Sequence, residues 1–373
     1  MSNLNQYKHT KNQKQKVMKR TVLLMSAVLA VASCGFAQGL NKNEVKALQS
    51  FLTQTSQKGN TNGAVLGLQG NNIASLEGVK VSGGHVTEIN WSGKDLAGTL
   101  NLSNFPALTK VNVSNNKLTS LTLSNNPQLV EINAGKNRIA QLDITNCPQV
   151  QEIRVNRNRL ADMDLGQVPL LKTLNIAGNQ FEALDVTNAV NLQNLNCMSN
   201  RLESLDVTGC QSLKNLYAGY NDITSIELAG LVKLENLNLN SNKIMKLYLQ
   251  NLPSLTTLFC SDNHMIELAL NECKAINEVW APYNDLTSFT VGNAQQLAFV
   301  NLNWNDLTTL TLSGLNFLQR LNVANNQLIT LDVTNDPMLT TINVTNNDML
   351  NDLRTEMCPM LRNVIGDAEW SNF

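Results

Sequence analysis

Histidine beside acidic residues is the combination with which this chain could perform acid–base or metal chemistry, and the sequence holds three histidines. His9 lies in the basic N-terminal stretch, His85 precedes the first repeat, and His264 falls near Asp262 and Glu278 when positions are counted along the repeat described below. A lone exposed histidine is more often ordinary surface than a site. No P-loop, G-x-S-x-G, H-E-x-x-H or paired-carboxylate motif accompanies it. We therefore predict no enzyme, no catalytic residue, no metal and no cofactor.

The seven cysteines offer thiol chemistry, but their spacing builds neither a disulfide framework nor a zinc site. Cys147, Cys210 and Cys273 recur at one position of the repeat, and Cys358 joins them after a late insertion. Equivalent positions three turns apart are about 14 Å distant at one strand spacing per turn, which is too far for a disulfide. No C-x2-C pair is present. We expect buried, free thiols that pack as small apolar side chains.

Aromatic side chains offer a third kind of chemistry, which is contact with a partner surface. One outward strand position is asparagine in eight units, from Asn112 to Asn343, and four other units replace it. Three of the four replacements are aromatic, although aromatic residues make up only 5% of the chain. An exposed aromatic cluster against a polar background marks a contact surface. The predicted partner-binding residues are Tyr217, Tyr220, Phe259, Trp280, Tyr283, Phe299, Trp304 and Arg154. The alternative is that these rings only pack on one another and stabilise their strands.

These side chains take their positions from a repeat of 21 residues. Steps of 21 from Leu118 reach an apolar residue each time, up to Met349. In the same frame asparagine recurs twelve times, at Asn116, Asn137, Asn158, Asn179, Asn200, Asn221, Asn242, Asn263, Asn284, Asn305, Asn326 and Asn347. An amide both donates and accepts, so these residues can satisfy buried backbone groups where the chain turns inside the coil. We predict that this asparagine ladder is structural.

One unit, residues 129–139, reads L-x-x-L-x-L-x-x-N-x-L, and its L-x-L alternation predicts a short strand with one face inward. The pattern resembles the leucine-rich repeat, and specifically bacterial surface proteins of the internalin-like branch with 21-residue units. The resemblance covers residues 86–364, about 13 units. It implies an α/β-type leucine-rich repeat solenoid that is mostly β, with parallel strands on the concave face and short β or 3₁₀ segments on the convex face.

A variant of that branch carries cysteine at the third strand position. Cys197 and Cys260 match this pattern, while most other units carry another apolar residue there, such as Val113 or Ala134. The chain therefore resembles a partial cysteine-ladder variant. In the same family the concave face grips a protein partner, which the resemblance implies for this chain as well.

Both ends of the repeat array are predicted to be capped. Residues 38–85 combine a helical pattern that starts near Asn43, a loop over 53–74 and a lead-in segment to the repeats. One extra residue is expected near Ala97, and Leu353 falls one residue late.

At the other end, residues 365–373 form the predicted C-terminal cap. Trp370 and Phe373 would cover the open edge of the last turn, which otherwise invites end-to-end pairing.

The first 37 residues are predicted to be a signal peptide. A basic stretch is followed by the apolar run 22–32, which is too short to span a membrane. Two processing sites fit: an ordinary small-residue site at residues 35–37, or a lipoprotein box in which Cys34 is acylated. Either site predicts export to the cell envelope, the outer surface or the medium. Met18 would be a tidier start than Met1.

Charge narrows the class of partner. The whole chain holds 28 Lys and Arg against 29 Asp and Glu, and loss of residues 1–37 removes six basic residues and no acidic one. The remaining 22 basic and 29 acidic residues are unlike a nucleic-acid or anionic-membrane binder. Membrane contact is expected only through an N-terminal lipid.

The residue that follows each ladder asparagine changes sign along the chain. It is basic at Lys117, Arg138, Arg159 and Arg201, and acidic at Asp222, Asp285, Asp306 and Asp348. Complementary charge around an aromatic anchor suits a protein partner. The predicted function is a non-enzymatic, exported recognition module for adhesion or host or envelope interaction. The alternatives are a glycan-binding module that uses the aromatic patch, and a structural envelope protein.

Overall fold

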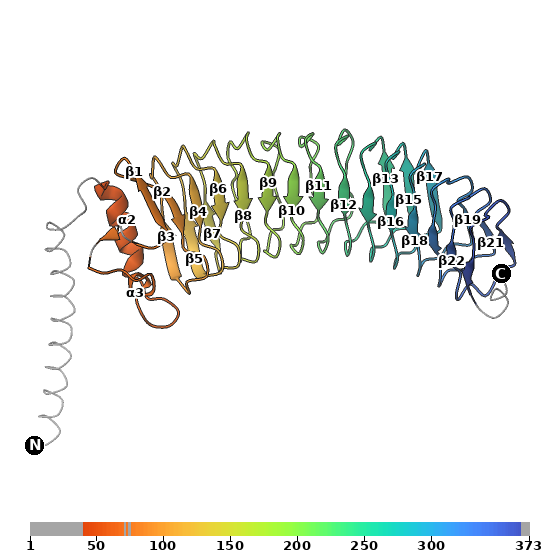
Figure 1. Cartoon of the computed structure of the whole chain (residues 1–373), viewed down its shortest axis with the longest axis horizontal. Helices are drawn as coiled ribbons and strands as arrows, with labels where there is room; N and C mark the ends of the chain where they lie inside the picture. Colours follow the sequence, from red (N-terminus) through yellow and green to blue (C-terminus); the bar gives the residue numbers. More distant parts are fainter. Residues whose placement is uncertain (1–39, 71, 74–75, 367–373) are drawn as a thin grey trace, which may run out of the picture.

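The computed structural model describes residues 40–70, 72–73 and 76–366, which form an elongated, arched solenoid (Figure 1). Each turn stacks on the one before it, with the helices at one end and the last strand at the other (Figure 1). The predicted leucine-rich repeat solenoid of about 13 turns is confirmed. The signal peptide with Cys34, and the capping residues Trp370 and Phe373, lie outside the described residues, so those predictions stay predictions.

A single sheet of 15 strands runs the length of the solenoid. Its strands are β1 (Val79–Ser82), β2 (His85–Asn90), β4 (Lys110–Asn112), β6 (Glu131–Asn133), β8 (Glu152–Arg154), β9 (Thr173–Asn175), β10 (Asn194–Asn196), β11 (Asn215–Tyr217), β12 (Asn236–Asn238), β14 (Thr257–Phe259), β16 (Glu278–Trp280), β18 (Phe299–Asn301), β20 (Arg320–Asn322), β22 (Thr341–Asn343) and β24 (Asn363–Ile365). β1 pairs antiparallel with β2, and all later neighbours pair in parallel. The expected position of this sheet on the concave side stays a prediction.

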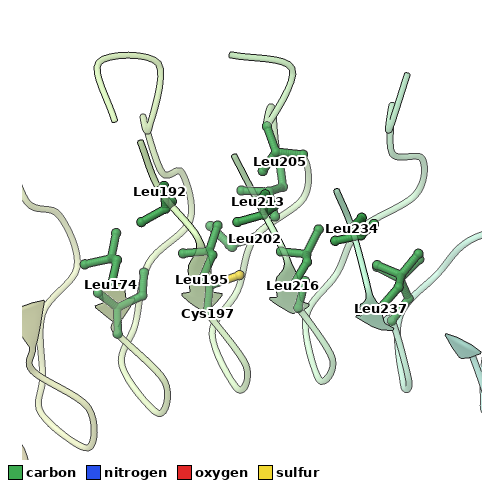
Figure 2. Packing of buried hydrophobic residues seen from close by; sticks show 14 of the residues in the cluster. Leu174, Leu192, Leu195, Cys197, Leu202, Leu205, Leu213, Leu216, Leu234 and Leu237 are labelled. Carbon is green, nitrogen blue, oxygen red and sulfur yellow. The ribbon is translucent and has the colours of Figure 1, made fainter. Parts of the chain in front are cut away.

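Most strands of the large sheet are three residues long because only their middle residue points inward. In β10, Leu195 is fully buried, while Asn194 and Asn196 are half-buried on the outer surface. Leu216 occupies the same place on the next turn, directly paired with Leu195. Stacked leucines of this kind form one continuous core along the solenoid axis (Figure 2). The outer surface of this sheet, formed by the first and third residues of each short strand, is called the sheet face below.

The second half of some turns forms three smaller sheets of three strands. They are β3 (Ala97–Asn101), β5 (Lys117–Thr122) and β7 (Gln141–Asp143), then β13 (Lys246–Gln250), β15 (Glu267–Asn271) and β17 (Ser288–Gly292), and finally β19 (Thr309–Thr311), β21 (Thr330–Asp332) and β23 (Asp352–Arg354). The turns between β7 and β13 have no strand pairing on this side. In these turns one outward position is acidic four times running, at Asp164, Asp185, Asp206 and Glu227. Like charges on adjacent strands disfavour pairing, which accounts for the gap.

The strand register confirms both predicted insertions. Paired strands of the large sheet are 22 residues apart for β2–β4 and β22–β24, and 21 residues apart between them. The late insertion overturns one detail of the sequence pattern, because Met349 does not fill the apolar repeat position. Met349 is 64% exposed and Leu350, which is 5% exposed, takes its place in the core.

The N-terminal cap is built around helix α2 (Lys42–Leu52). Asn41 caps it by accepting hydrogen bonds from the Asn43 and Glu44 N–H groups. Its buried face stacks Phe51 on Trp91, with ring centroids 5.8 Å apart. The predicted loop over 53–74 also contains the one-turn helix α3 (Asn62–Val65), because Thr61 Oγ1 caps its Ala64 N–H group.

A buried acid joins this cap to the large sheet. Glu44 is 1% exposed, and its carboxylate accepts a hydrogen bond from Val86 N at 2.8 Å and contacts His85 Nδ1 at 2.7 Å.

Across the described ranges, neither helix has the length and apolar character required to cross a bilayer.

Five cysteines are buried free thiols, and Cys358 is partly buried. Burial raises the pKa of Cys197 to about 12 and raises the pKa of Cys260 as well. Cys197 and Cys260 are three turns apart, with Ala218 and Leu239 at the intervening core positions. The cysteine-ladder part of the prediction is therefore not supported, because the two thiols do not stack on each other.

Candidate functional site

Each ladder asparagine lies four residues after the end of a strand of the large sheet, as Asn242 does after β12, and its amide holds neighbouring turns together. In Asn242, Oδ1 accepts a hydrogen bond from Ile223 N on the preceding turn at 3.0 Å. Its Nδ2 donates to Ala218 O at 3.1 Å and to Leu239 O at 3.0 Å. The same three bonds recur from Asn137 to Asn347, at constant sequence separations. These amides are committed to the backbone, so a ligand would have to be bound by other residues.

The residue just before each ladder asparagine, called the rim position below, has a left-handed backbone. Its φ lies between 54° and 69° in every turn from Asn115 to Asn346. Glycine and asparagine adopt this conformation readily, whereas other side chains strain the backbone by roughly 1–2 kcal/mol. Tyr220, Tyr283 and Trp304 nevertheless occupy rim positions, with φ of 58°, 56° and 57°. Their presence is unfavourable for the isolated fold, which points to another reason for keeping them.

A second row of asparagines, on the sheet face, is structural as well. Asn238 Oδ1 accepts a hydrogen bond from the N–H group two residues later, at 3.1 Å, which closes an Asx turn. All eight sheet-face asparagines make this bond: Asn112, Asn133, Asn175, Asn196, Asn238, Asn301, Asn322 and Asn343. Replacing one of them with an aromatic residue therefore removes a hydrogen bond from the fold.

The chain compensates for two of these replacements. Pro282 follows Trp280 at the donor position and has no N–H group to satisfy. After Phe259, Ser261 N donates instead to Asn240 Oδ1 on the preceding turn, at 2.8 Å. The aromatic residues thus stand in local structures adapted to them, rather than at positions that tolerate any side chain.

Four of the predicted residues form two stacked pairs on three successive turns and are called the aromatic cluster below: Phe259, Trp280, Tyr283 and Trp304. Phe259 and Trp280 stack on the sheet face with ring centroids 6.4 Å apart and planes at 28°. Tyr283 and Trp304 stack along the rim at 6.0 Å and 13°. Trp280, Tyr283 and Trp304 are 38%, 57% and 51% exposed, which is unusual for rings of this size. The acids Asp262, Asp285 and Asp306 border the rim pair.

The other predicted partner-binding residues lie apart from this cluster. Tyr217 and Tyr220 are two turns before Phe259, about 10 Å along the axis at one strand spacing per turn. Phe299 lies at the opposite end of its strand, where the Arg320 guanidinium covers its ring at 5.5 Å. Arg154 is three turns before Tyr217 and pairs with Glu152.

His264 does not gather the acids expected from the sequence. Its Nδ1 lies 3.8 Å from Asp285 Oδ2 on the next turn, and both side chains are well exposed. Glu278 instead accepts a hydrogen bond from Trp280 Nε1 at 3.4 Å. Within the part of the chain that the structure describes, no three His, Cys, Asp or Glu side chains are grouped so as to hold a metal ion.

Sequence reasoning passed over one polar position in the core. Asn126 and Asp336 occupy the position that holds Cys147 and Cys210 on other turns, and both are fully buried. Counting by 21 from Cys147 reaches both residues, so the signal was present in the sequence. The significance of Asp336 depends on hydrogen-bond geometry, which the period does not reveal.

Comparison with known proteins supports the fold and goes no further. No protein-family model matches the chain, and neither does any curated protein. Among solved structures, YopM from Yersinia enterocolitica WA-314 is 24% identical with a TM-score of 0.59, over 73% of this chain and 60% of that one. This chain therefore spans less than two thirds of that structure. YopM from Yersinia pestis, described as a leucine-rich effector protein, is 23% identical with a TM-score of 0.54, over 72% and 76% of the two chains.

An internalin from Listeria monocytogenes, InlF, is 19% identical with a TM-score of 0.54, over 76% of this chain and 91% of that one. At these identities the similarity concerns the architecture alone. The chain has the same solenoid architecture as these bacterial leucine-rich repeat proteins, with repeats of about 21 residues.

Proposed function

We propose that this protein is a non-enzymatic, exported recognition module that binds a protein partner through the sheet face and the adjoining rim. The observation that carries the proposal is the placement of the aromatic cluster. Phe259 and Trp280 stand where eight other turns use asparagine, and Tyr283 and Trp304 stand at left-handed rim positions, which other turns fill with Asn, Gly, Ser, Asp, Tyr or a basic residue. A role in strand packing alone does not account for positions that strain the backbone or remove a hydrogen bond.

The composition of the cluster favours a protein partner. Large exposed rings next to ionised side chains are typical of the centre and the border of protein interfaces. Asp262 lies one turn before the rim rings, Asp285 and Asp306 follow Tyr283 and Trp304 by two residues, and a partner with complementary basic residues would be steered towards these acids. The structural neighbours named above include an effector and an internalin, which is consistent with an interaction role but does not identify the partner.

The decisive variant is Tyr283→Asn/Trp304→Asn, because asparagine already occupies the rim position at Asn115, Asn325 and Asn346. The change removes the stacked pair, worth about 1 kcal/mol, and relieves strain of similar size at each residue. We expect the variant to be as stable as the wild type, or more stable. A marked loss of stability would instead mean that the rings serve the fold.

Binding is tested by affinity capture from host-cell and envelope extracts with the full chain as bait, followed by mass spectrometry. The proposal expects a protein that the wild type retains and that Tyr283→Asn/Trp304→Asn loses. The matched control, Tyr248→Asn/Phe317→Asn, removes two exposed rings outside the sheet face and should retain the protein. Capture that resists protease and is abolished by periodate would favour the glycan alternative. Equal capture by all three baits would contradict the proposed site.

A further inference from the structure

A polar hollow of about 400 Å³ opens on the sheet face near the N-terminal end of the solenoid. Ser92, Ser114, Asn133, Lys136, Arg154 and Asn156 are among the residues that line it. We call it the basic hollow. It spans four successive turns, and Arg154, one of the predicted partner-binding residues, forms part of its wall rather than part of the aromatic cluster.

Four basic side chains on two neighbouring turns flank this hollow. Lys136 and Arg138 come directly before and after the ladder asparagine of one turn in the sequence. Arg157 and Arg159 come directly before and after that of the next turn. All four side chains are exposed, and within the described ranges none of them forms an ion pair. We call them the basic rim. The acids nearest on the sheet face are already paired, Glu131 with Lys110 and Glu152 with Arg154.

Lys136 and Arg157 share the backbone signature of the aromatic cluster. Both occupy rim positions, with φ of 57° and 56°, where residues other than glycine, asparagine and aspartate are strained. In the wall of the hollow, Gly135 packs closely against the next turn, because a Cβ atom at this residue would lie 2.6 Å from Asn156 Oδ1. Unpaired cations held at strained positions beside an open polar hollow are independent indications of a ligand.

The donors of the hollow suit oxygen anions. Asn133 Oδ1 accepts the Gly135 N–H hydrogen bond, so its Nδ2 group is the part left to face a ligand. The hydroxyls of Ser92 and Ser114 lie 2.8 Å apart, and Ser114 donates its proton to Asn112 Oδ1 at 2.8 Å, so both hydroxyl protons are engaged within the protein. Guanidinium and ammonium groups then supply the charge that makes hydrogen bonds to an anion strong.

The length of the basic rim selects the kind of anion. The four unpaired charges occupy two turns, about 5 Å apart. In the same row Lys117 lies one turn earlier, and Arg201 lies two turns later, where it approaches Glu182 at 4.0 Å. From Asp222 onward the row is mainly aromatic and acidic, and its one lysine, Lys243, is paired with Asp222. A long polyanion such as a sulfated glycan would run into this acidic half. Carboxylates at alternating positions of an extended peptide lie about 7 Å apart, which matches a short patch. We infer that the basic hollow and basic rim bind an acidic segment of the protein partner, a second contact that rests on the proposed function and adds its chemistry.

The inference is tested by fluorescence anisotropy with the full chain and a labelled peptide of alternating Glu and Ser residues. A Gln–Ser peptide of equal length and a heparin oligosaccharide serve as comparison probes. We expect the Glu–Ser peptide alone to bind well, with an affinity that falls as NaCl rises from about 0.05 M to about 0.3 M. Tighter binding of heparin, equal binding of the Gln–Ser peptide, or no binding of the Glu–Ser peptide would overturn the inference.

Two variants locate the contact. Lys136→Asn/Arg157→Asn removes two charges while placing a residue favoured by left-handed backbone, so it should fold and bind the peptide at least about tenfold more weakly. Lys233→Asn/Arg362→Asn removes the same charge elsewhere on the surface and should leave the affinity unchanged. Equal losses in both variants would reduce the effect to overall charge and contradict the site.

The outcome is separable from that of the proposed function. Tyr283→Asn/Trp304→Asn leaves the basic hollow intact and should bind the peptide like the wild type. If the peptide fails to bind while partner capture still depends on the aromatic rings, only the acidic-segment contact is wrong. If the peptide binds and no partner protein is captured through the rings, the proposed function fails instead.

Discussion

At the scale of single residues, Asp336 occupies a core position that calls for a hydrogen-bond donor. Asn126, at the same position of an earlier turn, accepts from Phe105 N and donates Nδ2 hydrogens to Leu102 O and Leu123 O. Asp336 Oδ1 accepts from Leu315 N at 2.6 Å, but its buried Oδ2 has no partner among the described residues. By the spacing seen at Asn126, Oδ2 faces backbone carbonyl oxygens. A carboxylate would be repelled there, whereas a protonated carboxyl group can donate.

The pKa of Asp336 reflects this surrounding. Burial raises it to about 7, the N–H groups of Leu315 and Gly314 oppose the shift, and the charge of Asp332 adds to it. Cys358, on the next turn, is a thiol whose own pKa is raised by burial and which donates to Val333 O at 3.0 Å. Because the folded pKa is above the ordinary value of 3.8, the folded state binds the proton more tightly than the unfolded chain. The stability from that proton is complete below about pH 4 and is lost as pH rises through about 7.

We therefore predict that Asp336→Asn stabilises the protein, and more so at high pH, because the amide donates without needing a proton. The gain should grow by at most about 1.4 kcal/mol per pH unit between about pH 4 and about pH 7. The measurement is the difference in urea midpoint between variant and wild type at about pH 5 and about pH 8, which cancels other titrating groups. An equal difference at both pH values would refute the account.

The ladder provides a second prediction at this scale. Asn242→Ala leaves the Ile223 N–H group and the Ala218 and Leu239 carbonyl groups without the side-chain partner that they have in the wild type. These buried polar groups, left without a hydrogen-bond partner, should lower the free energy of unfolding by about 2–4 kcal/mol. Asn188→Ala, on an exposed residue, should change it by less than about 0.5 kcal/mol. Urea unfolding of both variants checks this, and similar effects would mean that the ladder has no special role in stability.

The structural role of a residue could be predicted from the sequence where the 21-residue period alone determines that role. The ladder asparagines and the buried leucines follow directly from steps of 21. The prediction that Met349 fills the core position was wrong, because one residue inserted after Asn347 moves that position to Leu350. Two apolar residues in succession hide the shift in the sequence. The cost of an aromatic residue on the sheet face could not be predicted either, since the Asx turn that asparagine closes there is a matter of geometry.

At the scale of elements, the large sheet is continuous and the opposite side is not. A three-residue strand needs only one inward apolar residue, which every unit supplies. On the other side, pairing depends on outward residues that tolerate close neighbours. Thr122, Thr290 and Thr311 lie in strands there, whereas Asp185 and Asp206 stand in the unpaired gap. The sequence therefore predicts the position of the short strands only when neighbouring units are compared.

This contrast predicts a salt-dependent effect of charge in the gap. Asp185 and Asp206 each accept hydrogen bonds from the Thr two residues later, which lower both pKa values, while Asp185 raises that of Asp206. Asp185→Asn/Asp206→Asn keeps an acceptor for each threonine and removes the repulsion. Because both pKa values are lowered overall, the hydrogen bonds to the threonines outweigh the repulsion, so we expect the two single variants and the double variant to have lower urea midpoints than the wild type. At low salt the stability lost in the double variant should exceed the sum of the two single losses, because each single change already relieves the repulsion; at about 1 M NaCl, where charges are screened within about 3 Å, the losses should add. A departure from additivity that persists at high salt would exclude repulsion as the cause.

At the scale of the whole molecule, the two candidate contacts occupy different segments of one stack. The basic hollow lies on the first four turns of the solenoid, and the aromatic cluster lies several turns further along. Contacts in a solenoid are made between neighbouring turns, so stability is approximately a sum over units and interfaces. Such an architecture fixes the distance between two sites by the number of units between them, without coupling their local structures.

Removal of one complete unit tests this independence. Residues 180–200 are the 21 residues that follow the ladder residue Asn179, up to and including the next ladder residue, Asn200. Their deletion joins Asn179 to Arg201 in frame. We expect a folded solenoid, shorter by about 5 Å, with unchanged affinity for the Glu–Ser peptide because the basic hollow is complete. Circular dichroism, gel filtration and anisotropy measure these outcomes. Deletion of residues 180–201, one residue more, leaves a unit of 20 residues, shorter than the spacings of 21 or 22 between paired strands of the large sheet. It should displace inward leucines and yield poorly folded protein, since a one-residue slip exchanges the buried and exposed faces of a strand. Equal folding of the two deletions would mean that the turns absorb the missing residue and that the 21-residue period is not what sets the distance between the sites.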